Sequence, residues 1–179
     1  MLGLGYIDFG AFVIAVTKPG AARMPNGIEA EVNPIRGASA VIGGGALQID
    51  GVTVEPGPAW EPVPAVVHVP QAVMHHRPDP ERLAGRGPGL TPAGDDILAG
   101  YVAGLTLFHH REPEAEAIAG RAARLTTALS ATLLRHAAKG ELPEPAHAWL
   151  EGGDPRALEA FGHTSGRCLM LGLTLAVGA

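Results

Sequence analysis

The chain has 179 residues, 46% of them hydrophobic and 4% aromatic, so it suits one domain or two small ones with an aliphatic core. Its 13 basic and 18 acidic residues give a formal net charge of −5, which argues against a nucleic-acid partner. The single cysteine, Cys168, excludes an internal disulfide and any zinc site built from several cysteines.

The N-terminal segment lacks the basic residues that begin a secretory signal peptide, and Asp8 interrupts its apolar residues. No later apolar run reaches the roughly 18 residues that a membrane-spanning helix needs. We therefore expect a cytoplasmic protein that has no membrane partner.

Residues 1–70 are expected to be rich in β-strands. Residues 11–17 form a β-branched apolar run, and residues 28–32 alternate between apolar and acidic side chains. Asp50-Gly51 predicts a hairpin turn that leads into residues 52–54. Short strands with close turns favour a short antiparallel β-barrel or sandwich.

Residues 71–179 are expected to be helical and to share a core with the β-rich part, which makes the fold class α+β with a C-terminal helical bundle. Trp60 is the expected core residue where the two parts meet. The predicted helices run from Thr91 (as N-cap) towards His110, over 113–139 with Gly140 as C-cap, over 142–151 and 155–161, and from Thr164 to the C-terminus.

The most informative segment is the glycine-rich loop at residues 85–96, which runs into a predicted helix. Its glycines let the backbone take positive φ angles and approach a ligand closely. The first N–H groups of a helix have no acceptor within the helix, so this junction is a natural anion site. We expect a phosphate or carboxylate to be held here by Arg86, Gly87, Gly89, Leu90, Thr91 and Gly94.

Asp95 and Asp96 follow in the first helical turn and are the candidate catalytic residues. Neighbouring helix positions diverge by about 100°, so one carboxylate is expected to face the ligand while the other caps or pairs. The facing carboxylate could ligate Mg²⁺, accept a hydrogen bond from an amide NH₂, or act as a base. A purely structural role, in which both acids stabilise the helix dipole, is the alternative.

A short internal similarity links residues 93–100 to residues 165–172, since each segment opens with a small residue and Gly, and a second Gly follows six positions later. Two buried helices that start alike are expected to pack side by side at their glycines, with their N-termini at one pocket. His163, Thr164, Ser165 and Gly166 are then expected to add hydroxyl and backbone donors to that pocket.

The histidine pairs His75-His76 and His109-His110 are the remaining candidates for a metal site. Neighbouring side chains on a helix or strand point apart, so neither pair forms a natural two-ligand site. We predict no metal-ligating residues there and expect surface histidines.

Residues 85–100, Gly-Arg-Gly-Pro-Gly-Leu-Thr-Pro-Ala-Gly-Asp-Asp-Ile-Leu-Ala-Gly, resemble the signature of a bacterial domain-of-unknown-function family. That family includes a subunit of oxamate carbamoyltransferase from anaerobic allantoin degradation. Trp60-Glu61-Pro62 and the segment from Gly162 to Gly166 resemble two further family motifs. Family members are usually longer in the β-rich part, and the resemblance implies an acidic residue about where Cys168 stands.

The resemblance implies a part in carbamoyl transfer between carbamoyl phosphate and oxamate, within an assembly of partner subunits or a homo-oligomer. Two alternatives from other classes stay open. One is a non-catalytic binding or assembly module, and the other is a Mg²⁺-dependent hydrolase that uses Asp95 or Asp96.

Overall fold

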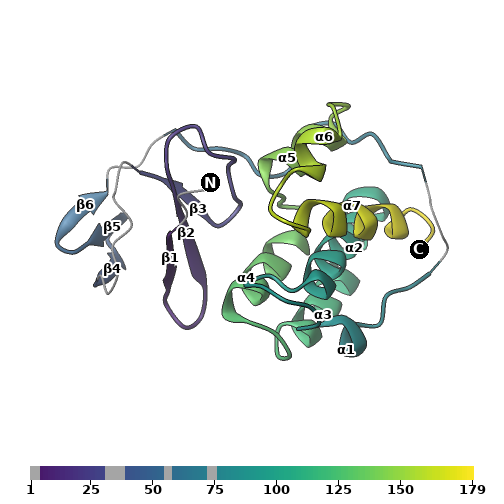
Figure 1. Cartoon of the computed structure of the whole chain (residues 1–179), viewed down its shortest axis with the longest axis horizontal. Helices are drawn as coiled ribbons and strands as arrows, with labels where there is room; N and C mark the ends of the chain where they lie inside the picture. The colour runs from purple at the N-terminus through teal and green to yellow at the C-terminus, as the bar shows by residue number, and fades with distance from the viewer. Residues whose placement is uncertain (1–4, 31–38, 55–57, 72–75) are drawn as a thin grey trace.

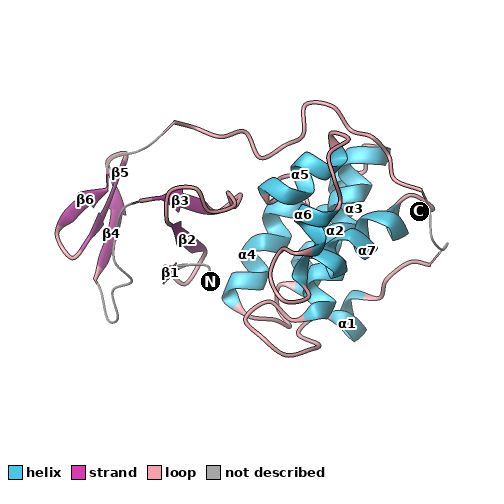
Figure 2. Cartoon of the chain, turned by 45° about the horizontal axis from the view of Figure 1, so that its top comes forward, coloured by secondary structure: helices cyan, strands magenta, loops and turns pink. Residues whose placement is uncertain are grey.

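The structure, a computed structural model, describes residues 5–30, 39–54, 58–71 and 76–179. These residues form two small β-sheets and a group of helices beside them (Figures 1 and 2). The strands are β1 (Gly5–Asp8), β2 (Val13–Thr17), β3 (Gly27–Glu29), β4 (Ala40–Gly43), β5 (Ala46–Ile49) and β6 (Val52–Val54). The helices are α1 (Pro80–Leu83), α2 (Ala93–His109), α3 (Glu112–Ala122), α4 (Ala128–Ala137), α5 (Glu144–Leu150), α6 (Arg156–Glu159) and α7 (Ser165–Ala176).

The first sheet has the order β1-β2-β3, with β1 antiparallel and β3 parallel to the central strand. All five residues of β2 are buried, as expected for a β-branched strand covered on both faces. The strand is tied to the helices because the Val13 N–H donates to the Thr132 hydroxyl of α4 at 3.0 Å.

The second sheet is the antiparallel meander β4-β5-β6. Asp50 and Gly51 form its predicted hairpin turn, with φ angles of 50° and 79°. Ile14 and Val16 of the first sheet share one buried cluster with Leu47 and Ile49 of the second. The α+β class is confirmed, but within the described residues the two sheets pack together without closing a barrel, and one strand pair is parallel.

Trp60 lies at the junction that the sequence predicts, although it is only partly buried. Its ring centroid is 5.7 Å from that of His147 on α5. The connecting segment continues along the helices, since the Pro62 carbonyl accepts from the Leu142 N–H at 2.9 Å. The proposed division of the chain near residue 70 stays a prediction. None of the described helices is long and apolar enough to cross a membrane.

The prediction of a single helix over residues 113–139 is wrong, because this segment forms two helices, α3 and α4. The Thr127 hydroxyl accepts from the Ser130 N–H at 3.1 Å and caps a new helix start there. Thr91 is not the N-cap of α2, which is Pro92. The helix considered at residues 70–76 falls mostly outside the described residues.

Helices α2 and α7 form the centre of the helical part and run parallel, in contact through their glycines. A β-carbon added at Gly100 would lie 2.1 Å from the Leu169 carbonyl oxygen and 3.0 Å from the Gly172 Cα. One added at Gly172 would lie 2.0 Å from the Ile97 carbonyl oxygen. The expectation that the two similar segments pack at their glycines is therefore confirmed.

The similarity extends to the segment before each helix. Asp79 precedes the short helix α1, and its side chain accepts from the Glu81 N–H at 2.9 Å. Asp154 precedes α6 in the same way and accepts from the Arg156 N–H at 3.0 Å. Each short helix is followed by a loop and then by a long glycine-marked helix, so the chain contains the same structural unit twice.

We expect Gly100→Ala to lower the free energy of unfolding by about 3 kcal/mol or more, because backbone atoms of α7 occupy the space that a methyl group needs. Gly120→Ala is the matched control, since this exposed glycine of α3 has nothing within 4 Å of an added β-carbon. It should raise stability by about 0.5–1 kcal/mol. Denaturant unfolding of the two variants measures both effects, and equal stabilities would contradict the close helix contact.

Candidate functional site

The parallel packing of α2 and α7 brings their N-termini together at one end of the helix pair. The hydroxyls of Thr91, just before α2, and Ser165, the first residue of α7, lie 3.1 Å apart. Asp96 of α2 lies beside both hydroxyls, each of which lowers the pKa of its carboxyl group. Two segments 74 residues apart in the sequence thus contribute to one candidate site.

Asp95 has a structural part in this site. Its side chain is 2% exposed, and Oδ1 accepts from the Gly85 N–H at 2.8 Å. Oδ2 accepts from the Thr126 hydroxyl, which stands in the segment that separates α3 from α4. Both oxygens are therefore occupied by protein donors, and Asp95 fixes the start of the glycine loop against the helices.

Asp96 is the carboxylate with unused capacity. It is 8% exposed, and its Oδ2 is buried without a hydrogen bond of normal geometry to any described residue. Its pKa is raised from 3.8 to about 7, mainly by burial and to a smaller extent by the negative charge of Asp95, against the lowering effect of the Ser165 and Thr91 hydroxyls. A carboxyl group that titrates near neutrality can serve both as a proton acceptor and as a proton donor.

The glycine loop precedes this site in the chain and is exposed at residues 85–90. Gly87 and Gly89 have φ angles of 118° and 100°, which other residues rarely adopt. Within the described chain, no protein atom accepts a hydrogen bond from the backbone N–H of Gly87, Gly89, Leu90 or Thr91. The loop therefore offers several backbone donors from an exposed segment, close to a buried carboxyl group.

Gly94 and Gly166 differ from expectation, because their N–H groups are already used. The Gly94 N–H donates to the Arg86 carbonyl and the Gly166 N–H to the Phe161 carbonyl, both at 2.9 Å. An added β-carbon would lie 2.0 Å from the Leu83 carbonyl oxygen at Gly94 and 1.7 Å from the Leu158 carbonyl oxygen at Gly166. Both glycines are needed for close packing, and neither has a free backbone donor for a ligand.

The other predicted site residues lie around this centre. The Arg86 side chain is exposed and forms no ion pair with a described residue. His163 and Thr164 are also exposed, and Thr164 is the N-cap of α7 without a capping hydrogen bond from its side chain. Of the predicted residues, the structure brings the side chains of Asp96, Thr91 and Ser165 together.

Cys168 is a neighbour of this site that the residue pattern alone did not single out. Burial raises the pKa of its thiol, and the charge of Asp96 raises it further, so the two groups lie close together. Cys168 holds the same place in the second structural unit that Asp96 holds in the first, two residues after the glycine. This internal correspondence was the signal that could have identified it.

A metal site is not apparent among the residues that the structure describes. They contain no group of three or more His, Cys, Asp or Glu side chains arranged to hold a metal ion. His109 instead contacts the Ala176 carbonyl oxygen of α7 at 2.7 Å.

Comparison with known proteins yields one family. A family model described as "Oxamate carbamoyltransferase subunit AllH" matches residues 83–177, which is more than half of the chain. The match begins just before the glycine loop and includes both long helices of the site. No solved structure matches the chain.

We expect Asp96→Asn to be more stable than the wild type above pH 7. Asp96 is neutral in both states below pH 3.8, and as the pH rises towards 7 the unfolded chain ionises while the folded chain keeps its proton. The wild type therefore loses on the order of 4 kcal/mol relative to the variant across this interval. Thermal unfolding at several pH values measures the difference.

Asp95→Ala is the contrasting variant. It leaves the Gly85 N–H without its acceptor, so it should cost about 1–3 kcal/mol. An Asp96→Asn variant that is no more stable than the wild type above pH 7 would show that the Asp96 carboxylate is well solvated.

Proposed function

The chain belongs to the family of the oxamate carbamoyltransferase subunit AllH, and we propose that it binds the acceptor substrate of a carbamoyl-transferring assembly. The ligand is a small molecule that carries a carboxylate and an amide on neighbouring carbons, as oxamate does. Its site is the glycine loop together with the first turns of α2 and α7. Partner subunits complete the active assembly.

The polar groups of the site match the two ends of such a ligand. The unused N–H groups of Gly87, Gly89, Leu90 and Thr91 suit a carboxylate, and the free side chain of Arg86 adds a positive charge. The buried Oδ2 of Asp96 lacks a donor, and an amide NH₂ supplies one. An anion without an amide would instead face the repulsion of the Asp96 carboxylate.

Asp96 is also suited to the chemistry of carbamoyl transfer. The amide nitrogen of the acceptor forms a bond to the carbamoyl carbon while the bond from that carbon to the phosphate oxygen breaks. The nitrogen must lose a proton in this step, and Asp96 accepts it. A carboxyl group with a pKa of about 7 is partly ionised at neutral pH, and its ionised form binds a proton more strongly than an ordinary carboxylate does. Ser165 and Thr91 orient the carboxylate through their hydroxyls.

The unpartnered, buried oxygen of Asp96 is the observation that carries this proposal. A Mg²⁺-dependent hydrolase that used both acids is disfavoured, because both oxygens of Asp95 already accept from protein donors. A purely passive assembly module has no need for a carboxyl group that costs stability in this position.

We predict that oxamate binds more tightly as the pH rises through about 7, since the ionised Asp96 accepts from the amide NH₂. Oxalate, which has a second carboxylate in place of the amide, should bind roughly tenfold or more weakly in that range. Asp96→Asn should lose the pH dependence and shift the preference towards oxalate. Calorimetric titration of the full chain with each anion measures these affinities.

Glu116→Gln is the matched control, because it makes the same change from carboxylate to amide on an exposed face of α3. It should leave both affinities unchanged. Equal binding of oxamate and oxalate by the wild type at every pH would contradict the proposed site. With partner subunits present, an Asp96→Asn variant that binds oxamate and transfers carbamoyl groups at the normal rate would contradict the base.

A further inference from the structure

A second pocket lies where α2 ends and α3 begins, away from the glycine loop. Its volume is about 240 Å³, and its walls are formed by His76, Arg77, Tyr101, Arg111, Gly178 and Ala179. These residues come from the segment before α1, from α2, from the turn before α3 and from the segment after α7. None of them belongs to the site proposed above.

The end of α2 explains why Arg111 stands in this pocket. His110 adopts a left-handed conformation with a φ of 56°, and its N–H donates to the Thr106 carbonyl. The bond from His110 is that of an αL motif, and the Arg111 N–H then donates to the Leu105 carbonyl at 3.0 Å. This tight turn fixes the backbone of Arg111 directly beyond the helix.

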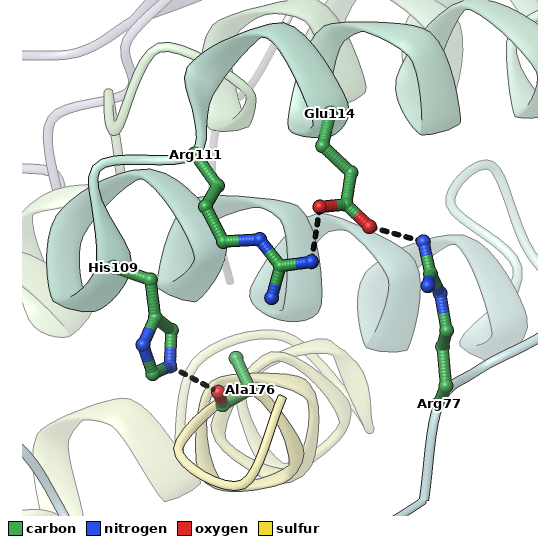
Figure 3. Close-up of polar contacts among 5 residues, drawn as sticks. All are labelled: Arg77, His109, Arg111, Glu114 and Ala176. Atoms are coloured by element: carbon green, nitrogen blue, oxygen red, sulfur yellow. Dashed lines mark hydrogen bonds and ion pairs between the residues drawn. The ribbon is translucent and has the colours of Figure 1, made fainter.

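Two guanidinium groups line this pocket. Arg77 and Arg111 approach the carboxylate of Glu114 from its two sides, and each guanidinium contacts a different oxygen (Figure 3). One negative charge is thus shared between two positive ones. Each guanidinium has five N–H donors, so most of its donors stay available to a further acceptor.

Tyr101 adds a buried polar group to the same pocket. The residue is 1% exposed, yet its hydroxyl forms no hydrogen bond with a described residue. Burial raises its pKa, with smaller effects from the charges of Arg77, Glu114 and Arg111, so the phenol lies near this ion group and keeps its proton at neutral pH. Because Tyr101 lines the cavity, its hydroxyl can donate a hydrogen bond to a molecule bound there.

From the shared position of Arg77, Arg111 and Tyr101 in one cavity, we propose that this pocket is a second ligand site, which binds a small oxyanion. The ligand is a carboxylate or a phosphate group. It accepts hydrogen bonds from the two guanidinium groups and from the phenol.

The test uses the full chain and its backbone amide signals in nuclear magnetic resonance, which suits a protein of 18.4 kDa. Inorganic phosphate and acetate are titrated separately. Shifts at residues 77, 101 and 111 with either anion support the proposal, and the tighter of the two identifies the preferred group. If neither anion shifts the signals of these residues, the proposal is overturned.

Two variants and one control make the test specific. Arg77→Gln changes a side chain that is 62% exposed, so the fold should be retained, and it should weaken binding roughly tenfold. Tyr101→Phe removes only the hydroxyl and should weaken binding roughly threefold or more. Arg121→Gln removes a comparable exposed arginine of α3, which pairs with Glu81, and should have no effect.

The result is independent of the glycine-loop site. Asp96→Asn should leave these shifts unchanged, because Asp96 lies at the other site. Anion-induced shifts confined to residues 87–91 would overturn the second site while leaving the proposed function intact. Unchanged affinity in both Arg77→Gln and Tyr101→Phe would likewise overturn it.

Discussion

The contact between the backbones of α2 and α7 at Gly100 and Gly172 determines most of what this chain can do. Two helices that approach so closely exclude any side chain at the crossing. Because they run parallel, their N-termini meet at the same end, and the positive ends of both dipoles add there. Parallel dipoles repel each other, so the arrangement depends on the packing of the apolar cluster that surrounds it. The two N-termini form an electropositive end of the helix pair, which favours a negative charge on a nearby buried carboxyl group.

The chain uses the same structural unit twice, but the two copies carry different chemistry. Asp95 and Asp96 of the first unit correspond to Arg167 and Cys168 of the second. If both units carried acids at the second position, two carboxylates would face each other across the helix pair and would compete for one proton. With a thiol at residue 168, Asp96 is the only carboxyl group of the pair, so its pKa depends mainly on burial and then on the Ser165 hydroxyl and the charge of Asp95. The asymmetry therefore gives the site one proton acceptor instead of a shared dyad.

The sequence was sufficient to predict features that depend on neighbouring residues, or on a short pattern that occurs twice in the chain. The Asp50-Gly51 turn follows from the φ angles it needs, and the pairing of α2 with α7 follows from two segments with matching glycines. Long-range contacts were not predictable in this way. The break between α3 and α4 brings Thr126 to Asp95, and no helical pattern reveals that partner. The sequence predicts that one of the two neighbouring acids faces the ligand and the other caps or pairs, but it does not tell which of Asp95 and Asp96 has which role. The second pocket was missed because its residues are spread over the chain and Tyr101 resembles an ordinary core residue.

The two candidate sites differ in the way that they use helix α2. At its N-terminal end a carboxyl group with an empty acceptor position is buried, and near its C-terminal end two arginines and a phenol line a cavity. The unpartnered oxygen of Asp96 does not improve the stability of the folded chain, since it costs free energy that an apolar residue of similar size would not. Most of the helical core around it is aliphatic. Such a distribution is expected of a subunit whose polar groups are completed by ligands, because binding then supplies the hydrogen bonds that folding leaves unmade.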